Sequence, residues 1–158
     1  MKLCRFVNEQ TLWACLAAFS LYSRDLDTAE IALASCESIE KVQFISKIKS
    51  IPSDTAKRAY LALYFQRPEE AEQILIQGRL YYRALKMNIK LYKWDRALEI
   101  ATSQKKYLDI LLGYRARYLE SIEKEEFDPK FLKFREEASK VDWEQIKQKI
   151  AAEKASEK

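Results

Sequence analysis

The stretch that decides the fold is WACLAAF, residues 13–19, which mixes small and large apolar residues and carries no charge. Its apolar residues continue into neighbouring positions at the three- and four-residue spacing of an α-helix. Two adjacent stripes result, which consist of Leu12, Leu16 and Phe19 and of Trp13, Ala17 and Leu21. A helix that is apolar over most of its circumference should be covered on more than one side. We therefore expect this helix to pack between other helices.

Cys15 allows two interpretations, a reactive thiol or part of the seam where one helix packs against the next. A reactive thiol needs a nearby cation or histidine that favours the thiolate, and the sequence places neither beside Cys15. A buried cysteine behaves as a small apolar residue, and Ala14, Ala17 and Ala18 would let a facing helix approach closely. The packing seam is the favoured interpretation.

The composition is that of an ordinary globular chain. With 158 residues, of which 48% are hydrophobic and 33% charged, the chain is long enough for one domain with a core. The net charge of +4 is low for a nucleic-acid module. Three cysteines without a C-x-x-C pair argue against a disulfide framework or a zinc site and fit a reducing, intracellular setting. No apolar run reaches the roughly 18 residues that span a bilayer, so we expect no membrane insertion.

The missing residue types exclude several kinds of active site. The chain has no histidine, the commonest general base and metal ligand. Its two glycines form neither of the two phosphate-binding loop motifs. The carboxylate pairs Glu69–Glu70 and Glu125–Glu126 lie at expected helix ends, where solvation or a helix dipole explains them. We predict that the chain is not an enzyme and holds no cofactor and no metal.

Helical spacing continues along nearly the whole chain, and no strand pattern competes with it. Pro52 followed by Ser53 or Asp54 predicts a break and a new cap, Pro68 predicts a helix start, and Gly78 predicts a helix end. Short breaks between the helices predict antiparallel neighbours. The expected helices cover residues 27–35, 39–48, 54–66, 80–92, 95–103 and 108–125, with further helices from Pro68, from Pro129 and after Asp142.

Three helix starts resemble one another, DTAEIA (27–32), EEAEQI (69–74) and DRALEI (95–100), and a Leu-Tyr pair precedes each. The tetratricopeptide pattern requires small residues where two helices cross. With Trp13 at its aromatic position, Ala17, Ala29 and Cys36 occupy the small positions, and Ala59 and Ala71 repeat the spacing of Ala17 and Ala29. The distances between repeats are uneven, which indicates a degenerate array.

These patterns predict an all-α fold, a right-handed α-solenoid of antiparallel helix pairs with degenerate tetratricopeptide-like repeats. We expect residues 1–150 to form the helical array and residues 151–158 to form a frayed polar tail. The last helix carries Trp143, Ile146 and Ile150 at helical spacing among lysines. This stripe has two interpretations, a cap on the array or a surface for a groove on another chain, and the cap is favoured because a solenoid needs a polar-faced end.

Several segments resemble the C-terminal helical region of the eighty-kilodalton intraflagellar transport protein family. The resemblance covers about residues 2–150, and its first two segments are the most specific because helix packing does not dictate their residue order. The segments are LCRFV (3–7), EQTLWACLAA (9–18), TAEIA (28–32), KVQFI (41–45), EAE (70–72), LYKWDRALE (91–99) and DWEQIK (142–147).

The resemblance implies a structural, non-enzymatic subunit of complex B, in the trains that carry cargo along cilia. It implies that the partners are other complex B subunits, in the cilium or flagellum and at the basal body, with a cytoplasmic pool. Self-association is an alternative that the sequence leaves open. Members of the family carry two β-propellers ahead of this region, and both are absent here, so we expect either a fragment or a separately encoded C-terminal half.

A basic stripe is the sharpest predicted binding surface. Helical spacing places five cations in a single stripe on one helix, with Tyr82 beside them. Such a stripe is either a contact for an acidic helix of a neighbouring subunit or a solvated face. Nucleic acid fits it poorly because acids follow soon after and the net charge is low. The predicted protein-binding residues are Arg79, Arg83, Lys86, Lys90, Lys93 and Tyr82.

Three rival functions are weaker. A general tetratricopeptide-like peptide-binding adaptor, unrelated to cilia, would need a concave face rich in asparagine and cations, and the chain has only Asn8 and Asn88. A membrane-surface adaptor would rest on the lysine-rich tail alone. An enzyme has no supporting motif.

Overall fold

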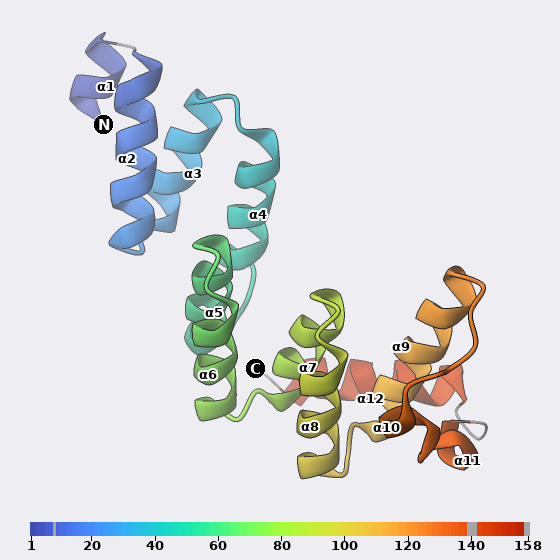
Figure 1. Cartoon of the computed structure of the whole chain (residues 1–158). Helices are drawn as coiled ribbons and strands as arrows, with labels where there is room; N and C mark the ends of the chain where they lie inside the picture. The colour runs from blue at the N-terminus through green and yellow to red at the C-terminus, as the bar shows by residue number, and fades with distance from the viewer. Residues whose placement is uncertain (8, 139–141, 157–158) are drawn as a thin grey trace. The chain divides into compact units, whose positions relative to one another are not determined.

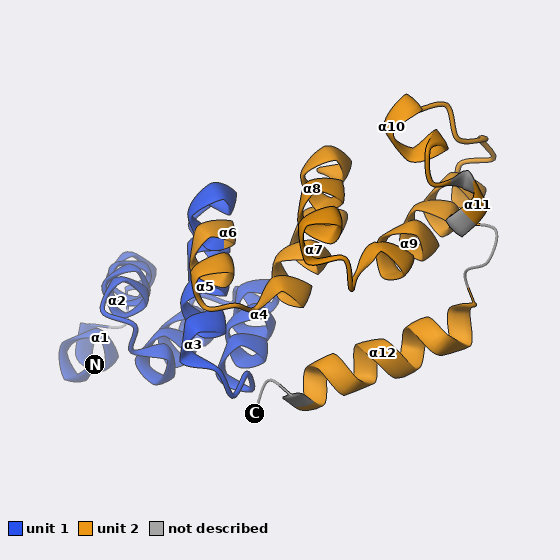
Figure 2. Cartoon of the chain, turned by 90° about the horizontal axis from the view of Figure 1, so that it is seen from below, with its two compact units in different colours: residues 1–71 blue, residues 72–158 orange. Residues whose placement is uncertain are grey.

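A computed structural model of the chain describes residues 1–7, 9–138 and 142–156. In those residues the regular structure is helical and no strand occurs, which confirms the predicted all-α class. The chain divides into two compact units, residues 1–71 and residues 72–158, which Figure 2 draws in blue and orange.

Unit 1 contains the first five helices and the beginning of the sixth (Figure 2). Its core includes Trp13, Ala17 and Leu21 from one helix and Ala29 and Leu33 from the next, so these two helices pack closely. The helices are α1 (Lys2–Val7), α2 (Gln10–Tyr22), α3 (Leu26–Ser35), α4 (Ile39–Lys49), α5 (Asp54–Tyr64) and α6 (Pro68–Gln77).

Unit 2 takes the rest of α6 and the remaining helices. Leu85 of α7, Ile110 and Leu111 of α9 and Ile146 of α12 are fully buried in it, and α7 packs against α8 (Figure 1). The helices are α7 (Tyr81–Lys90), α8 (Trp94–Gln104), α9 (Leu108–Ser121), α10 (Pro129–Leu132), α11 (Arg135–Ala138) and α12 (Trp143–Ser156).

Most helix pairs are joined by the same short turn. After α2, the Asp25 N–H donates to the Ser20 carbonyl at 2.8 Å and the Arg24 N–H donates to the Leu21 carbonyl at 3.2 Å. This pair of hydrogen bonds defines a Schellman motif, whose turn residue takes the left-handed conformation. Asp25 then caps α3 by accepting from the Thr28 N–H. Seven non-glycine residues in the described part of the chain have positive φ, namely Arg24, Glu37, Gln66, Arg79, Tyr92, Lys105 and Glu123.

Several predicted boundaries are confirmed and others shift. Ser53 caps α5, Pro68 begins α6, and Asp142 accepts from the Glu144 N–H at 2.9 Å at the start of α12. α6 ends before Gly78, as predicted, but the left-handed residue of that turn is Arg79. The last helix continues to Ser156, into the segment expected to be a frayed tail, while residues 157–158 lie outside the described residues.

The alanines of the repeat pattern lie in the helix crossings. Ala29, Ala59 and Ala71 are fully buried and Ala17 is 3% exposed, so these predicted small-residue positions are confirmed, while Cys36 is half-buried. A larger side chain at such a crossing would force the helices apart.

Replacing Ala29 with leucine is therefore expected to lower the free energy of unfolding of unit 1 by about 1–3 kcal/mol. Ala34→Leu, on the exposed side of the same helix α3, is the matched control and should change it by less than about 0.5 kcal/mol. Urea unfolding followed by circular dichroism measures both. Equal effects of the two substitutions would contradict the assignment of Ala29 to a tight crossing.

Candidate protein-binding surfaces

The basic stripe on α7 contains fewer residues than the spacing in the sequence predicts. Arg83, Lys86 and Lys90 lie on one face of α7, which carries no acidic residue. Arg79 and Lys93 lie in the turns at either end, because Arg79 has a φ of 58° and Lys93 is the N-cap of α8. The expectation of a five-residue stripe on one helix is thus wrong. We call Arg83, Lys86 and Lys90 the α7 basic face.

Tyr82 is not part of this surface. Its side chain is 3% exposed and its ring lies 6.4 Å from the ring of Tyr107. The ammonium nitrogen of Lys86 lies 5.9 Å from the centre of the Tyr82 ring, within cation–π range. The expectation that Tyr82 contacts a partner is therefore corrected, because it supports Lys86 from the protein interior.

A buried polar network lies next to α7. The Asn88 amide donates to Glu72 at 2.9 Å and to the Ala84 carbonyl at 3.1 Å, and Arg96 donates to Glu72 at 2.6 Å. Asn88 is fully buried and Glu72 is 9% exposed. The network joins α6, α7 and α8, so it fixes the position of the α7 basic face. The sequence does not predict this network, because Glu72 and Asn88 resemble ordinary surface residues when each is considered alone.

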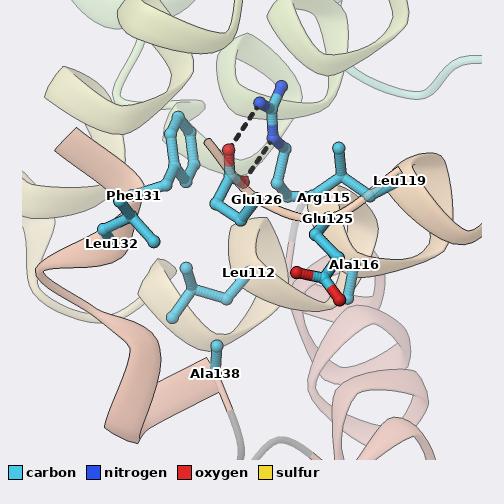
Figure 3. Close-up of a pocket in the computed structure, with 9 residues that line it drawn as sticks. All are labelled: Leu112, Arg115, Ala116, Leu119, Glu125, Glu126, Phe131, Leu132 and Ala138. Carbon is cyan, nitrogen blue, oxygen red and sulfur yellow. Dashed lines mark hydrogen bonds and ion pairs between the residues drawn. The ribbon is translucent and has the colours of Figure 1, made fainter. Parts of the chain in front are cut away.

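Arg115 of α9 is a buried cation in unit 2 and is 7% exposed. It donates from Nε and Nη2 to the two carboxylate oxygens of Glu126, at 2.8 and 2.9 Å (Figure 3). Its guanidinium also lies 5.0 Å from the Trp94 ring centre and 4.9 Å from that of Phe131. The pair fastens the segment after α9 to the helix. The sequence contains a signal for the burial of Arg115, since this residue lies between Leu111 and Leu119 on the apolar side of α9.

A pocket of about 290 Å³ lies beside this ion pair (Figure 3). Leu112, Leu119 and Phe131 line it, together with Arg115 and Glu126. Arg115 binds both carboxylate oxygens of Glu126, so this pair presents no unpaired charge to the pocket. The leucine and phenylalanine side chains give the pocket an apolar wall. The pair therefore stabilises the fold.

The Arg115–Glu126 pair makes unit 2 sensitive to acid. The hydrogen bonds from Arg115 lower the pKa of Glu126 from its usual value of 4.5, although burial acts in the opposite direction. A lowered pKa contributes stability that is complete above 4.5 and is lost as pH falls through the lowered value. We expect the free energy of unfolding to fall below about pH 4.5, and Glu126→Gln to flatten this dependence. Glu125→Gln, at the exposed neighbour, should leave the slope unchanged in urea titrations at several pH values.

α2 leaves an apolar face exposed. Trp13, Ala17 and Leu21 pack into the core, but Cys15 is exposed and Phe19 is 75% exposed. The expectation that Cys15 lies in a packing seam is therefore wrong. The helix is apolar on more than one side, and α3 covers the side that carries Trp13 and Ala17.

The last helix packs on unit 2. Ile146 is 1% exposed, and the Trp143 ring meets the Tyr114 ring of α9 edge-on at 5.4 Å. The guanidinium of Arg117 lies 3.6 Å from the Trp143 ring centre. Farther along, Glu153 accepts a hydrogen bond from the Tyr107 hydroxyl at 2.7 Å. The apolar stripe thus faces α9, as a cap would require.

Comparison with known proteins assigns the family. Residues 12–158 match the family model described as the IFT80/172/WDR35/WDR19 TPR domain. The chain belongs to this TPR-domain family. The match confirms the predicted tetratricopeptide-like α-solenoid class and the resemblance to the eighty-kilodalton intraflagellar transport family. In the residues that the structure describes, no helix of this TPR-family chain is long and apolar enough to cross a membrane.

Curated relatives of this TPR-family chain support the same family assignment. It is 44% identical to intraflagellar transport protein 80 homolog of Rattus norvegicus and 43% identical to that of Mus musculus, each over all 158 residues. It is 33% identical over 89 residues, 56% of its length, to WD repeat-containing protein 35 of Homo sapiens, of which it spans 8%. The chain spans 20% of the length of each protein 80 homolog.

Proposed function

We propose that the chain is a structural scaffold piece of intraflagellar transport complex B, which supports cilium assembly and cargo transport by binding other proteins. The observation that carries the proposal is 43–44% identity to two intraflagellar transport protein 80 homologs along the whole chain. Its fold and family suit stoichiometric binding, and we propose no catalysis. The match favours this function over a peptide-binding adaptor unrelated to cilia. The partners are other complex B subunits, and self-association is a second arrangement of the same kind.

The proposed contact is the α7 basic face. Lys90 is exposed and Arg83 and Lys86 are half-buried, and the three cations share one face of α7. The helix beneath is held by the Glu72–Asn88–Arg96 network, so the cations are presented on a fixed scaffold. Such a face suits an acidic helix of a neighbouring subunit, because complementary charges steer association and fix register.

We propose that the chain is located where these partners are. These places are the cilium or flagellum and the basal body, with a cytoplasmic pool. Affinity capture from ciliary extract, with this chain as bait and mass spectrometry as readout, tests the function. We expect intraflagellar transport subunits to be enriched over a tetratricopeptide array from outside the family. Equal recovery by both baits would contradict the proposal.

A further inference from the structure

Position 92 differs from the other left-handed turn positions. In the described part of the chain, the other six carry arginine, glutamate, glutamine or lysine, and this one carries Tyr92 with a φ of 56°. Glycine is the favoured residue in this conformation, and a side chain there costs roughly 1 kcal/mol. The ring of Tyr92 is nevertheless 65% exposed. A tyrosine whose backbone is strained and whose side chain is open to solvent suggests a role in binding.

Tyr92 belongs to a cluster of three rings with Trp94 and Tyr118, which we call the Tyr92 ring cluster. The ring centres of Tyr92 and Tyr118 are 5.3 Å apart, those of Trp94 and Tyr118 5.2 Å, and those of Tyr92 and Trp94 6.5 Å. Arg115 supports the cluster from the interior, 5.0 Å from the Trp94 ring centre. The rings therefore form a fixed platform at the α7–α8 turn.

A hollow of about 470 Å³ adjoins this platform, lined by Tyr92, Trp94 and Phe127 among others. Phe127 comes from the segment between α9 and α10 and is 71% exposed. Two exposed rings from separate segments thus border one hollow. Tyrosine and tryptophan are the residues most enriched in the centres of protein interfaces.

The charges that line the hollow are largely neutralised within the chain. Arg96 pairs with Glu72 at 2.6 Å, Arg115 pairs with Glu126, and Asp95 pairs with Lys130. The other two charged residues of the lining, Lys93 and Asp128, carry opposite charges, and Asp128 accepts from the Lys130 backbone N–H at 2.9 Å. A strongly acidic or basic ligand would gain little here. The hollow offers aromatic faces and little net charge.

The ring cluster also keeps hydrogen-bond donors available. Within residues 1–7, 9–138 and 142–156, the Trp94 indole N–H and the hydroxyls of Tyr92 and Tyr118 make no hydrogen bond. Each could donate to a backbone carbonyl of a bound segment. A polyproline II helix has no internal hydrogen bonds, so all its carbonyls are free to accept.

We propose that this hollow binds a proline-rich segment of another protein in the polyproline II conformation. Proline rings are uncharged and stack on aromatic faces, and such segments dock into aromatic-lined grooves. Their stiffness lowers the entropy lost on binding. An amphipathic helix fits less well, since it needs a long apolar groove. None of the three residues of the α7 basic face lines this hollow, so this proposal can fail while the scaffold function holds.

Fluorescence anisotropy of labelled decaproline, titrated with the whole chain, tests the proposal. We expect saturable binding, with no binding of a labelled Gly-Ser peptide of equal length. Tyr92→Gly removes the ring but suits the left-handed backbone, so the fold should be kept or stabilised. It should raise the Kd for decaproline at least about tenfold.

Glu123→Gly is the matched control, because it places glycine at another left-handed position away from the hollow. It should leave the Kd unchanged. Absence of saturable decaproline binding would overturn the proposal, and so would equal affinity of the Tyr92→Gly variant and the unchanged chain. Binding of an amphipathic helical peptide in place of decaproline, lost with Tyr92→Gly, would also overturn it in favour of a different ligand.

Discussion

Replacing Arg115 with methionine is expected to lower the free energy of unfolding of unit 2 by about 3 kcal/mol or more. The substitution keeps much of the apolar volume of the side chain but leaves Glu126, whose side chain is 19% exposed, without its bidentate partner. It also removes the cation that lies against the Trp94 and Phe131 rings. Urea unfolding followed by circular dichroism measures the change.

Lys124→Met is the control for this prediction, because it removes an equal charge from an exposed position near the same segment. It should change stability by less than about 0.5 kcal/mol. The double variant Arg115→Met, Glu126→Leu should regain part of the loss, because no unpaired carboxylate remains. A small effect of Arg115→Met, similar to that of Lys124→Met, would show that the pair does not hold the segment after α9.

Reversing the charge of the α7 basic face is expected to weaken binding to complex B subunits about a hundredfold. The variant carries Arg83→Glu, Lys86→Glu and Lys90→Glu. Three glutamates would face the acidic surface of the proposed partner, and like charges brought together across an interface cost several kcal/mol. Quantitative affinity capture from ciliary extract measures the loss, and circular dichroism checks that the variant folds.

The control variant carries Lys41→Glu, Lys47→Glu and Lys124→Glu, all at exposed positions outside α7. It has the same net charge as the α7 variant, so it separates a local contact from long-range attraction. We expect it to capture the subunits almost as well as the unchanged chain. If both variants lose binding equally, the effect is one of net charge and the α7 basic face is not the contact.

The helical framework could be predicted from the sequence because its signals are local. Pro68 at a helix start and Ser53 as a cap each act within one turn of chain. The repeat spacing predicts that Ala29 and Ala71 lie at helix crossings, and both are fully buried. Capping and small-residue spacing do not depend on which distant segment packs nearby.

The surface could be predicted only in part, because exposure depends on which face of a helix finds a neighbour. Tyr82 and Cys15 exchange their expected roles, since Tyr82 is buried against Tyr107 while Cys15 is exposed on α2. Left-handed turn residues are a second reason why the surface could be predicted only in part. Helical spacing predicts Arg79 as part of the stripe, but its backbone at φ 58° lies in the turn. Gly78 predicts the end of α6, but the left-handed residue is the next one, Arg79, where no glycine occurs.

We propose that this helical array binds the intraflagellar transport machinery directly. The measurement that tests it most directly is a titration of the labelled chain with complex B purified from cells that lack the endogenous eighty-kilodalton subunit. We predict saturable binding that weakens as salt rises, since a basic face contributes to it. Absence of binding at low salt, with a chain shown to be folded, would contradict the claim.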